Sequence, residues 1–152
     1  MPKRETEINT SIFTGLDLAK GDRLVDVVGL WGYRIEKVYQ NSEYDRVVNY
    51  SSNVIPLLIR KIKNQDTDIA LRATLAKTLA SFGIVLDKLV NELPDSETIR
   101  TAQRLRRGVL KGFDFCFSFP TAVFGISAVT TALNEFTQSD DVIALKQKYK
   151  IS

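Results

Sequence analysis

The residue types that most often carry out chemistry in proteins are scarce in this chain. It has no histidine and one cysteine, Cys116. Without histidine the usual general base and the commonest metal ligand are missing, and one cysteine allows neither an internal disulfide nor a thiolate metal cluster. Cys116 lies among phenylalanines, where a thiol is more often buried than reactive. The sequence therefore predicts a protein that is not an enzyme, with no catalytic residues, no metal site and no cofactor.

A run of arginines and lysines between Ile99 and Lys111 is the next candidate for a functional site. On a helix with about 100° per residue, the basic stripe of this run spans roughly 60°. Its members are Arg100, Arg104, Arg107 and Lys111. The apolar residues of the segment fall on the opposite side: Ala102, Leu105, Val109, Phe113 and Cys116. This spacing predicts an amphipathic helix with a basic stripe.

The segment that follows is rich in phenylalanine and then free of charge. Its aromatic residues alternate along the chain: Phe113, Phe115, Phe117 and Phe119. We expect them to lie on a helix, because a single short strand would lack a partner. From Phe115 to Asn134 no charged residue occurs over 20 positions, about the length that crosses a bilayer. The run is compatible with a membrane span, an interfacial segment or a segment buried in protein.

Three interpretations of the basic stripe are open. It could be the solvated face of a bundle helix, since surface arginines and lysines need no special explanation. It could be a membrane contact, since a basic amphipathic helix binds the interface of an anionic bilayer. It could also contact nucleic acid, which would be favoured by aromatic or amide side chains beside the arginines. The aromatic residues fall on the opposite side or the following turn, so the sequence favours a membrane over nucleic acid.

Amphipathic helices are expected to build the domain that positions these residues. Apolar residues recur at steps of three and four over 20–40, 47–62 and 71–89. Turn and capping residues separate these segments, and Pro56 is expected to kink or divide the second helix. A short polar helix is expected after Ser139. The expected fold is an all-α bundle of about five to seven helices with antiparallel neighbours.

The expected domain organisation is simple. Residues 1–8 form a polar N-terminal tail, and residues 9–152 form a single helical domain that starts with a helix over 9–19. A membrane-associated segment is expected at about 99–134, within that domain. The net charge of +3 is too small to imply a polyanionic partner by itself, so the distribution of charge carries the functional argument.

The 71–89 helix offers a second candidate membrane surface. Its residues are Lys77, Leu79, Phe82 and Leu86. A leucine-rich stripe at helical spacing is most often core, and it would also serve as a face that inserts into a membrane. Spacing alone does not separate these two roles.

The order of these motifs resembles the peroxisomal biogenesis factor eleven family, the peroxins that elongate peroxisomes. Gly21 and Arg23 are similar to part of a Gly-Arg-Asp-Lys stretch in that family. Trp31 and Arg34 fall where the family has an aromatic residue followed three positions later by an arginine. The stretches "LAKTLASFGIVLDKL" and "LRRGVLKGFDFCFSF" are similar in register to two later helices of the family. The resemblance covers residues 12–124.

The resemblance implies a protein on the cytosolic face of the peroxisomal membrane. An amphipathic helix would insert shallowly into anionic lipid and curve and elongate the membrane, which promotes peroxisome proliferation and division. The basic stripe, the four phenylalanines and the 71–89 residues named above would bind the membrane. Self-association and a link to the membrane-fission machinery are also implied, and no nucleic acid partner is expected. The alternative is a soluble cytoplasmic adaptor or assembly subunit, all-helical, with an apolar partner-binding surface.

Overall fold

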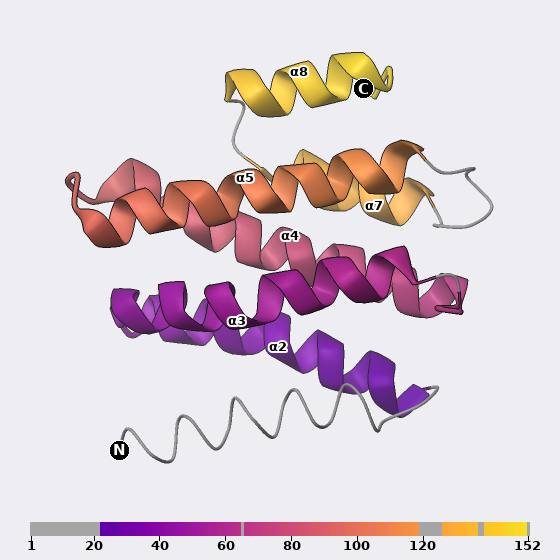
Figure 1. The fold of residues 1–152 in the computed structure, drawn as a ribbon, viewed down its shortest axis with the longest axis horizontal. Coiled ribbons are helices and arrows are strands. Elements are labelled where there is room, and N and C mark those ends of the chain that lie inside the picture. Colours follow the sequence, from indigo (N-terminus) through magenta and orange to yellow (C-terminus); the bar gives the residue numbers. More distant parts are fainter. Residues whose placement is uncertain (1–21, 65, 119–125, 137–138, 152) are drawn as a thin grey trace.

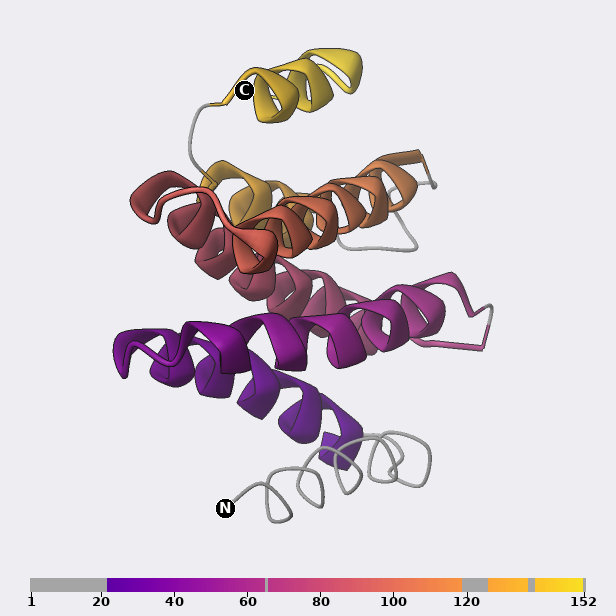
Figure 2. The same cartoon turned by 60° about the vertical axis from the view of Figure 1, so that its left-hand side comes forward.

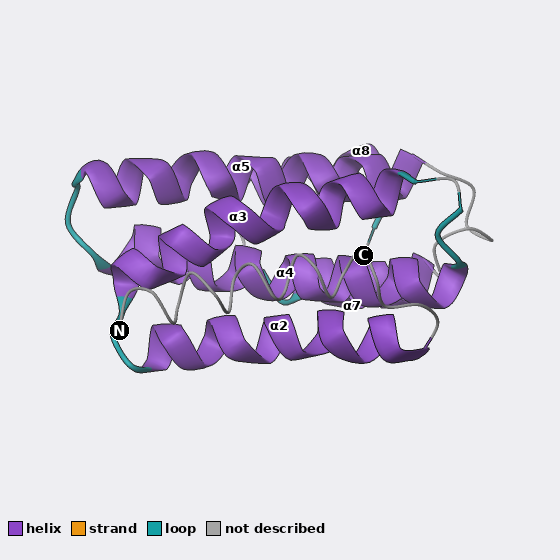
Figure 3. Cartoon of the chain, turned by 60° about the horizontal axis from the view of Figure 1, so that its bottom comes forward, coloured by secondary structure: helices purple, strands orange, loops and turns teal. Residues whose placement is uncertain are grey.

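Helices form nearly all of the part of the chain that the structure describes (Figure 1). The computed structural model describes residues 22–64, 66–118, 126–136 and 139–151, without the side chains of 22–27 and 126–128. In chain order the helices are α2 (Asp22–Gln40), α3 (Tyr44–Lys63), α4 (Ile69–Glu92), α5 (Glu97–Ser118), α7 (Ile126–Asn134) and α8 (Asp140–Lys148). These ranges contain no strand (Figure 3), so the predicted all-α bundle is confirmed. The tail at 1–8 and the helix expected at 9–19 lie outside the described residues.

The central helix of the bundle is α4. It packs against α2, α3, α5 and α7. Consecutive helices from α2 to α5 run antiparallel, as predicted, so α2 and α4 run side by side in the same direction (Figures 1 and 3). The helices α2 and α5 lie on opposite sides of α4, and α8 is an outermost helix beside α5 (Figures 1 and 2).

The predicted apolar stripes meet in one core. On α4, Leu75, Leu79, Leu86 and Leu89 are fully buried, and Leu58 of α3 is fully buried as well. Burying one leucine side chain contributes about 1.5–3 kcal/mol. Tertiary packing on α4, more than intrinsic helix propensity, therefore stabilises the helices.

Capping residues set the starts of α4 and α5 at the turns that the sequence predicts. Asp68 is the N-cap of α4, and its Oδ1 accepts a hydrogen bond from the backbone N–H of Leu71 at 2.8 Å. Ser96 precedes α5, and its Oγ accepts a hydrogen bond from the backbone N–H of Ile99 at 3.2 Å. Each cap satisfies a backbone donor that has no partner within the helix.

Pro56 does not divide α3. The helix is continuous from Tyr44 to Lys63 with Pro56 inside it, so the division considered from the sequence does not occur. Proline removes one backbone donor, which leaves the carbonyl of Ser52 without its helical partner. Both Pro56 and Ser52 are exposed, so water can take the place of the missing donor.

Gly83 marks a very close approach of α4 to its neighbours. A Cβ atom on Gly83 would lie 2.8 Å from Cγ1 of Val109 on α5 and would also collide with the ring of Phe136. Gly29, on α2, is the opposite case, because a Cβ atom there would have no heavy atom within 4 Å. Replacing each of these glycines with alanine therefore distinguishes the effect of packing on stability from the effect of helix propensity.

Gly83→Ala is expected to lower the free energy of unfolding by about 1–3 kcal/mol, because overpacking outweighs the gain in helix propensity of about 1 kcal/mol. Gly29→Ala is expected to raise it by about 0.5–1 kcal/mol, because nothing opposes the gain. Urea unfolding of both variants measures the two changes. A stabilised Gly83→Ala protein would contradict the close packing of α4 against α5.

Candidate functional site

The predicted basic stripe lies on one exposed face of α5, which we term the basic face. Its residues are Arg100, Arg104, Arg107 and Lys111, all exposed. At 1.5 Å per residue the basic face is about 16 Å long. Arg100 forms an ion pair with Asp95 at 3.6 Å between well-exposed side chains, and Arg104 donates to Thr101 Oγ1 at 3.2 Å. Exposed contacts of this kind contribute little free energy, so the cations are accessible to an external anion.

The opposite side of α5 is buried, as the amphipathic pattern predicts. Val109, Phe113 and Cys116 are 0% exposed. Burial raises the pKa of the Cys116 thiol to about 12, so the thiol stays protonated at neutral pH. A buried, protonated thiol is a poor nucleophile, which agrees with the structural role expected for Cys116. Within the described residues, no three His, Cys, Asp or Glu side chains are grouped in a way that could hold a metal ion.

Two of the predicted membrane-binding phenylalanines are core residues in the folded chain. The Phe-rich stretch is helical as far as Ser118, as predicted, and Phe119 lies outside the described residues. Phe113 and Phe117 are both buried, with ring centroids 6.4 Å apart. Phe136 packs edge-on against Phe113 at 5.7 Å. The folded bundle therefore does not present Phe113 or Phe117 to a membrane.

Phe115 differs from the other phenylalanines of α5. It is half-buried and follows Lys111 by one helical turn, so it extends the line of the basic face. The Nζ atom of Lys63 on α3 lies 5.3 Å from the centroid of its ring, within cation–π range. The basic face thus ends at a partly accessible aromatic ring with a further lysine over it.

The charge-free run from Phe115 to Asn134 does not form a single helix. The helix α5 ends at Ser118, and α7 begins at Ile126. With 9 residues, α7 is about 14 Å long, roughly half of the hydrocarbon thickness of a bilayer. It packs against α4 and α5, and its residue Leu133 is fully buried. In the described ends of the run, five apolar side chains are buried in protein, whereas Ser118, Thr131 and Asn134 are exposed. Residues 119–125 lie outside the described part.

One helix of the described part is long and apolar enough to cross a membrane. It is α4, with a mean hydropathy of 1.5 over an 18-residue window. However, 61% of that window is buried inside the bundle. The core helix of a soluble protein meets the same criteria of length and composition, so this observation is weak evidence for a span.

The second candidate membrane surface, on α4, needs correction. Leu79, Phe82 and Leu86 are at most 1% exposed. They lie in the core because α4 has neighbours on several sides, so the folded chain does not offer them to lipid. Lys77 is exposed and lies beside a groove between α2 and α4.

Trp31 and Arg34, the described residues of the motif that underlies the family resemblance, have packing roles in the bundle. Trp31 is 3% exposed, and the half-buried Arg34 lines a small recess with it, next to Tyr50 and Phe82. The side chain of Arg23 is not described, and Gly21 lies outside the described residues. Trp31 and Arg34 therefore have a role in the core and its edge.

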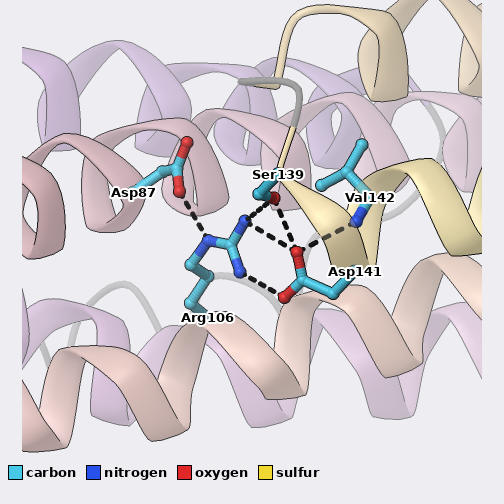
Figure 4. Close-up of polar contacts among 5 residues, drawn as sticks. All are labelled: Asp87, Arg106, Ser139, Asp141 and Val142. Atoms are coloured by element: carbon cyan, nitrogen blue, oxygen red, sulfur yellow. Dashed lines mark hydrogen bonds and ion pairs between the residues drawn. The ribbon is translucent and has the colours of Figure 1, made fainter.

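Arg106 is a buried residue that the sequence interpretation missed (Figure 4). Its Nε donates to Asp87 Oδ1 of α4 at 2.7 Å, and its Nη1 donates to Asp141 Oδ2 of α8 at 2.7 Å. Its Nη2 donates to Ser139 Oγ at 2.8 Å. Burial alone lowers the pKa of Arg106, but the hydrogen bond to Asp141 and the nearby Asp87 carboxylate outweigh burial and raise it. Arg106 thus joins three helices through one guanidinium.

A signal for this network was present in the sequence. Arg106 lies next to Arg107 in the chain but about 100° away around the helix, outside the basic stripe. Asp87 likewise interrupts the apolar helix α4. A buried arginine needs a carboxylate partner. Arg106 and Asp87 each lie off the polar side of their own helix, so their positions predict that the two residues pair. Asp141 could not be assigned in this way, because the neighbouring Asp140 is an equal candidate in the same turn.

Asp141 gives α8 a pH-dependent contact. Its hydrogen bond from Arg106 is the main cause that lowers its pKa from 3.8 to about 2. A lowered pKa means that the ionised carboxylate stabilises the fold above about pH 4 and that this contribution is lost as the pH falls towards 2. We expect the melting temperature to fall over this interval, and to fall less in Asp141→Asn. An equal pH dependence in Asp141→Asn would contradict this role.

Comparison of the chain with protein-family models, curated proteins and solved structures finds no match at any of the three levels. Function must therefore be argued from the chemistry of the described surface. The strongest feature of that surface is the basic face with Phe115 at its end.

Proposed function

We propose that this protein binds anionic membrane surfaces through the basic face of α5 and remodels the peroxisomal membrane from its cytosolic side. The observation that carries the proposal is the exposure of all four cations of the basic face along one helix, next to a half-buried aromatic ring. Negative lipid headgroups attract such a row, and an aromatic ring beside it suits the interface. Nucleic acid is disfavoured, because Phe115 is the only aromatic ring of α5 on this side among the described residues.

The magnitude of the electrostatic term indicates how the contact would work. Each lysine or arginine near an anionic surface contributes about 1 kcal/mol. Four such residues give about 4 kcal/mol, which corresponds to a dissociation constant of about 1 mM. The basic face alone would bind weakly and reversibly, so firm attachment requires apolar contact or several copies of the chain. Self-association would bring several copies of the basic face to one membrane.

Arg104→Glu with Arg107→Glu is expected to weaken binding to anionic vesicles at least about 30-fold, since two cations contribute about 2 kcal/mol. Flotation with vesicles of phosphatidylcholine, with and without about 30% phosphatidylserine, measures the effect. The matched control is Lys37→Glu with Lys88→Glu, which makes the same change in net charge at exposed positions of α2 and α4.

The control should retain more binding than the α5 variant. Equal losses in both variants would show that net charge, and not the basic face, determines binding. No binding of the intact protein to either vesicle would overturn the proposal.

The peroxisomal role rests on the resemblance to membrane-elongating peroxins. It includes self-association and delivery of the elongated membrane to the fission machinery. Localisation of a tagged protein, followed by alkaline carbonate extraction, tests the assignment. Peroxisomal signal that is released by carbonate supports a peripheral protein, and a purely cytoplasmic signal contradicts the role.

A second candidate function is that of a soluble helical adaptor. It is favoured by the groove of about 570 Å³ between α2 and α4. Leu30 and Tyr33 beside this groove are 54% and 58% exposed, more than any other large apolar side chain in the described residues. A monodisperse protein with a cooperative melt and no affinity for vesicles would favour the adaptor over the membrane protein.

A further inference from the structure

The helix α8 is fixed to the bundle at two polar contacts, one near each of its ends. Asp141 near its start pairs with Arg106 of α5, and Lys148 and Tyr149 at its end bind Asp114 of α5. Because both contacts follow the same order along the two helices, α8 runs parallel to α5 (Figure 1). This helix lies at the surface of the bundle, with little besides α5 close to it (Figures 1 and 2).

The first contact can open without leaving a charge unpaired in the interior. Arg106 also binds Asp87 at 2.7 Å, and this pair is the more deeply buried one. The Asp141 side chain is 48% exposed, against 5% for Asp87. If α8 moves away, Arg106 keeps Asp87, and Asp141 becomes hydrated. The usual penalty for breaking a buried ion pair therefore does not apply.

The second contact is also accessible to water. Lys148 Nζ lies 2.9 Å from Asp114 Oδ1, and the two side chains are 59% and 42% exposed. The hydroxyl of Tyr149 donates to the same carboxylate at 2.6 Å. Contacts with this exposure compete directly with hydration, so they hold α8 in place without making its departure costly.

Between these contacts, the apolar interface of α8 is small. Of the residues within the helix, Val142 and Leu145 are buried. An isolated helix of this length, 9 residues, has marginal stability in water. By contrast, α4 buries residues along its whole length and contacts most of the bundle. The docking of α8 is thus expected to open at a lower free energy than the rest of the fold.

Next to α8, the surface of α5 contains a second aromatic side chain, Phe117, in addition to Phe115 at the end of the basic face. The ring of Tyr149 lies 5.6 Å from the ring of Phe117, which is 9% exposed. Phe117 and the half-buried Leu110 lie on the flank of α5 that also carries Arg106 and Asp114. This flank adjoins the basic face on the same helix. Removing α8 would therefore place apolar side chains next to the row of cations.

We propose that α8 is a latch that covers an apolar flank of α5 and that its undocking converts weak electrostatic attachment into apolar insertion. The inference rests on the proposed membrane function and adds its regulation. In the docked state the basic face attracts anionic lipid, and Phe117 is shielded by Tyr149. In the undocked state Phe117 and Leu110 reach the interface. Asp114 then loses Lys148 and repels anionic headgroups, so the gain comes from apolar contact and not from added charge.

Native-state hydrogen exchange of the full chain tests the first half of the proposal. In the wild type, we expect α8 amides to open at least about 100-fold more often than α4 amides. The release variant Val142→Ser with Leu145→Ser should increase opening of α8 at least about 100-fold further, because both side chains are buried. Its matched control is Ile143→Ser with Ala144→Ser, which makes similar changes on the exposed side of α8. Exchange of α8 only together with α4 would overturn the latch.

Salt dependence of vesicle binding tests the second half. At 1 M salt the Debye length is about 3 Å, so attachment by the basic face alone should be lost. We expect wild type and control to lose binding at least about tenfold between 0.1 and 1 M salt, and the release variant to lose less than about threefold. Tyr149→Ala, which removes the shielding ring without changing charge, provides a milder variant if the double substitution unfolds the protein.

The outcomes separate the two proposals. If no variant binds anionic vesicles, the proposed membrane function fails. If the wild type binds in a salt-sensitive way and both release variants do the same despite faster exchange of α8, the latch fails and the proposed function stands. If the control also becomes salt-resistant, helix propensity and not the covered flank controls binding, and the latch fails.

Discussion

Arg106→Met is expected to lower the free energy of unfolding by about 3–5 kcal/mol, the range for removing one partner of a buried ion pair. The substitution keeps the aliphatic bulk of the side chain but removes the guanidinium that pairs with the buried carboxylate of Asp87 at 2.7 Å. Asp87 is 4% exposed, so water cannot replace the guanidinium easily. Urea unfolding at pH 7 measures the change.

Two further variants distinguish the loss of the charge partner of Asp87 from the loss of an arginine as such. Arg107→Met removes an exposed arginine next in the chain, and its effect should stay within about 0.5 kcal/mol. Asp87→Leu added to Arg106→Met should recover part of the loss, because an apolar pair of similar volume often replaces a buried ion pair without great cost. If Arg106→Met alone were as stable as Arg107→Met, the assignment of Arg106 as the partner of a buried charge would be contradicted.

Phe113→Ala is expected to destabilise the fold by about 3–5 kcal/mol, the range for a fully buried phenylalanine. Phe113 is 0% exposed and makes ring contacts with both Phe117 and Phe136, so its loss leaves a cavity where α5 meets the segment after α7. Thermal and urea unfolding measure the change. If Phe113 instead served mainly to contact lipid, its replacement would leave the stability of the lipid-free protein almost unchanged.

Phe115→Ala is the matched control for this test. Phe115 lies two residues away, but it is half-buried and adjoins the basic face. The cost in stability should be clearly smaller, about 1 kcal/mol, whereas binding to anionic vesicles should weaken. Equal destabilisation by the two variants would contradict the division of the phenylalanines between core and surface.

The helices and their ends were predictable because the information is local. Apolar residues at steps of three and four define the buried sides of α2, α3 and α4 from the chain itself. Side-chain caps such as Asp68 and Ser96 act within three residues of their position, so the turns that contain them were identified. The basic face of α5 was predictable for the same reason, since polar and apolar sides follow from the spacing alone.

The roles of the apolar residues were not predictable, because they depend on what packs against each helix. Leu79 and Phe82 have the spacing of a membrane-inserting stripe, but α4 lies at the centre of the bundle and buries them. The spacing of the alternating phenylalanines did not show which of them are buried, because Phe136, which packs against Phe113, lies far along the chain. Likewise, the partners of Arg106 are 19 and 35 residues away, beyond any local pattern.

The central place of α4 has a consequence for the order of events during synthesis. The helices α2 and α3 leave the ribosome before α4, yet α4 is the helix against which both of them pack. At about 5–20 residues per second, the 29 residues that follow Lys63, up to Glu92, take roughly 1.5–6 s to be made. During this interval α2 and α3 can contact each other but lack the cover that α4 provides. The nascent chain is thus expected to depend on chaperones until α4 emerges.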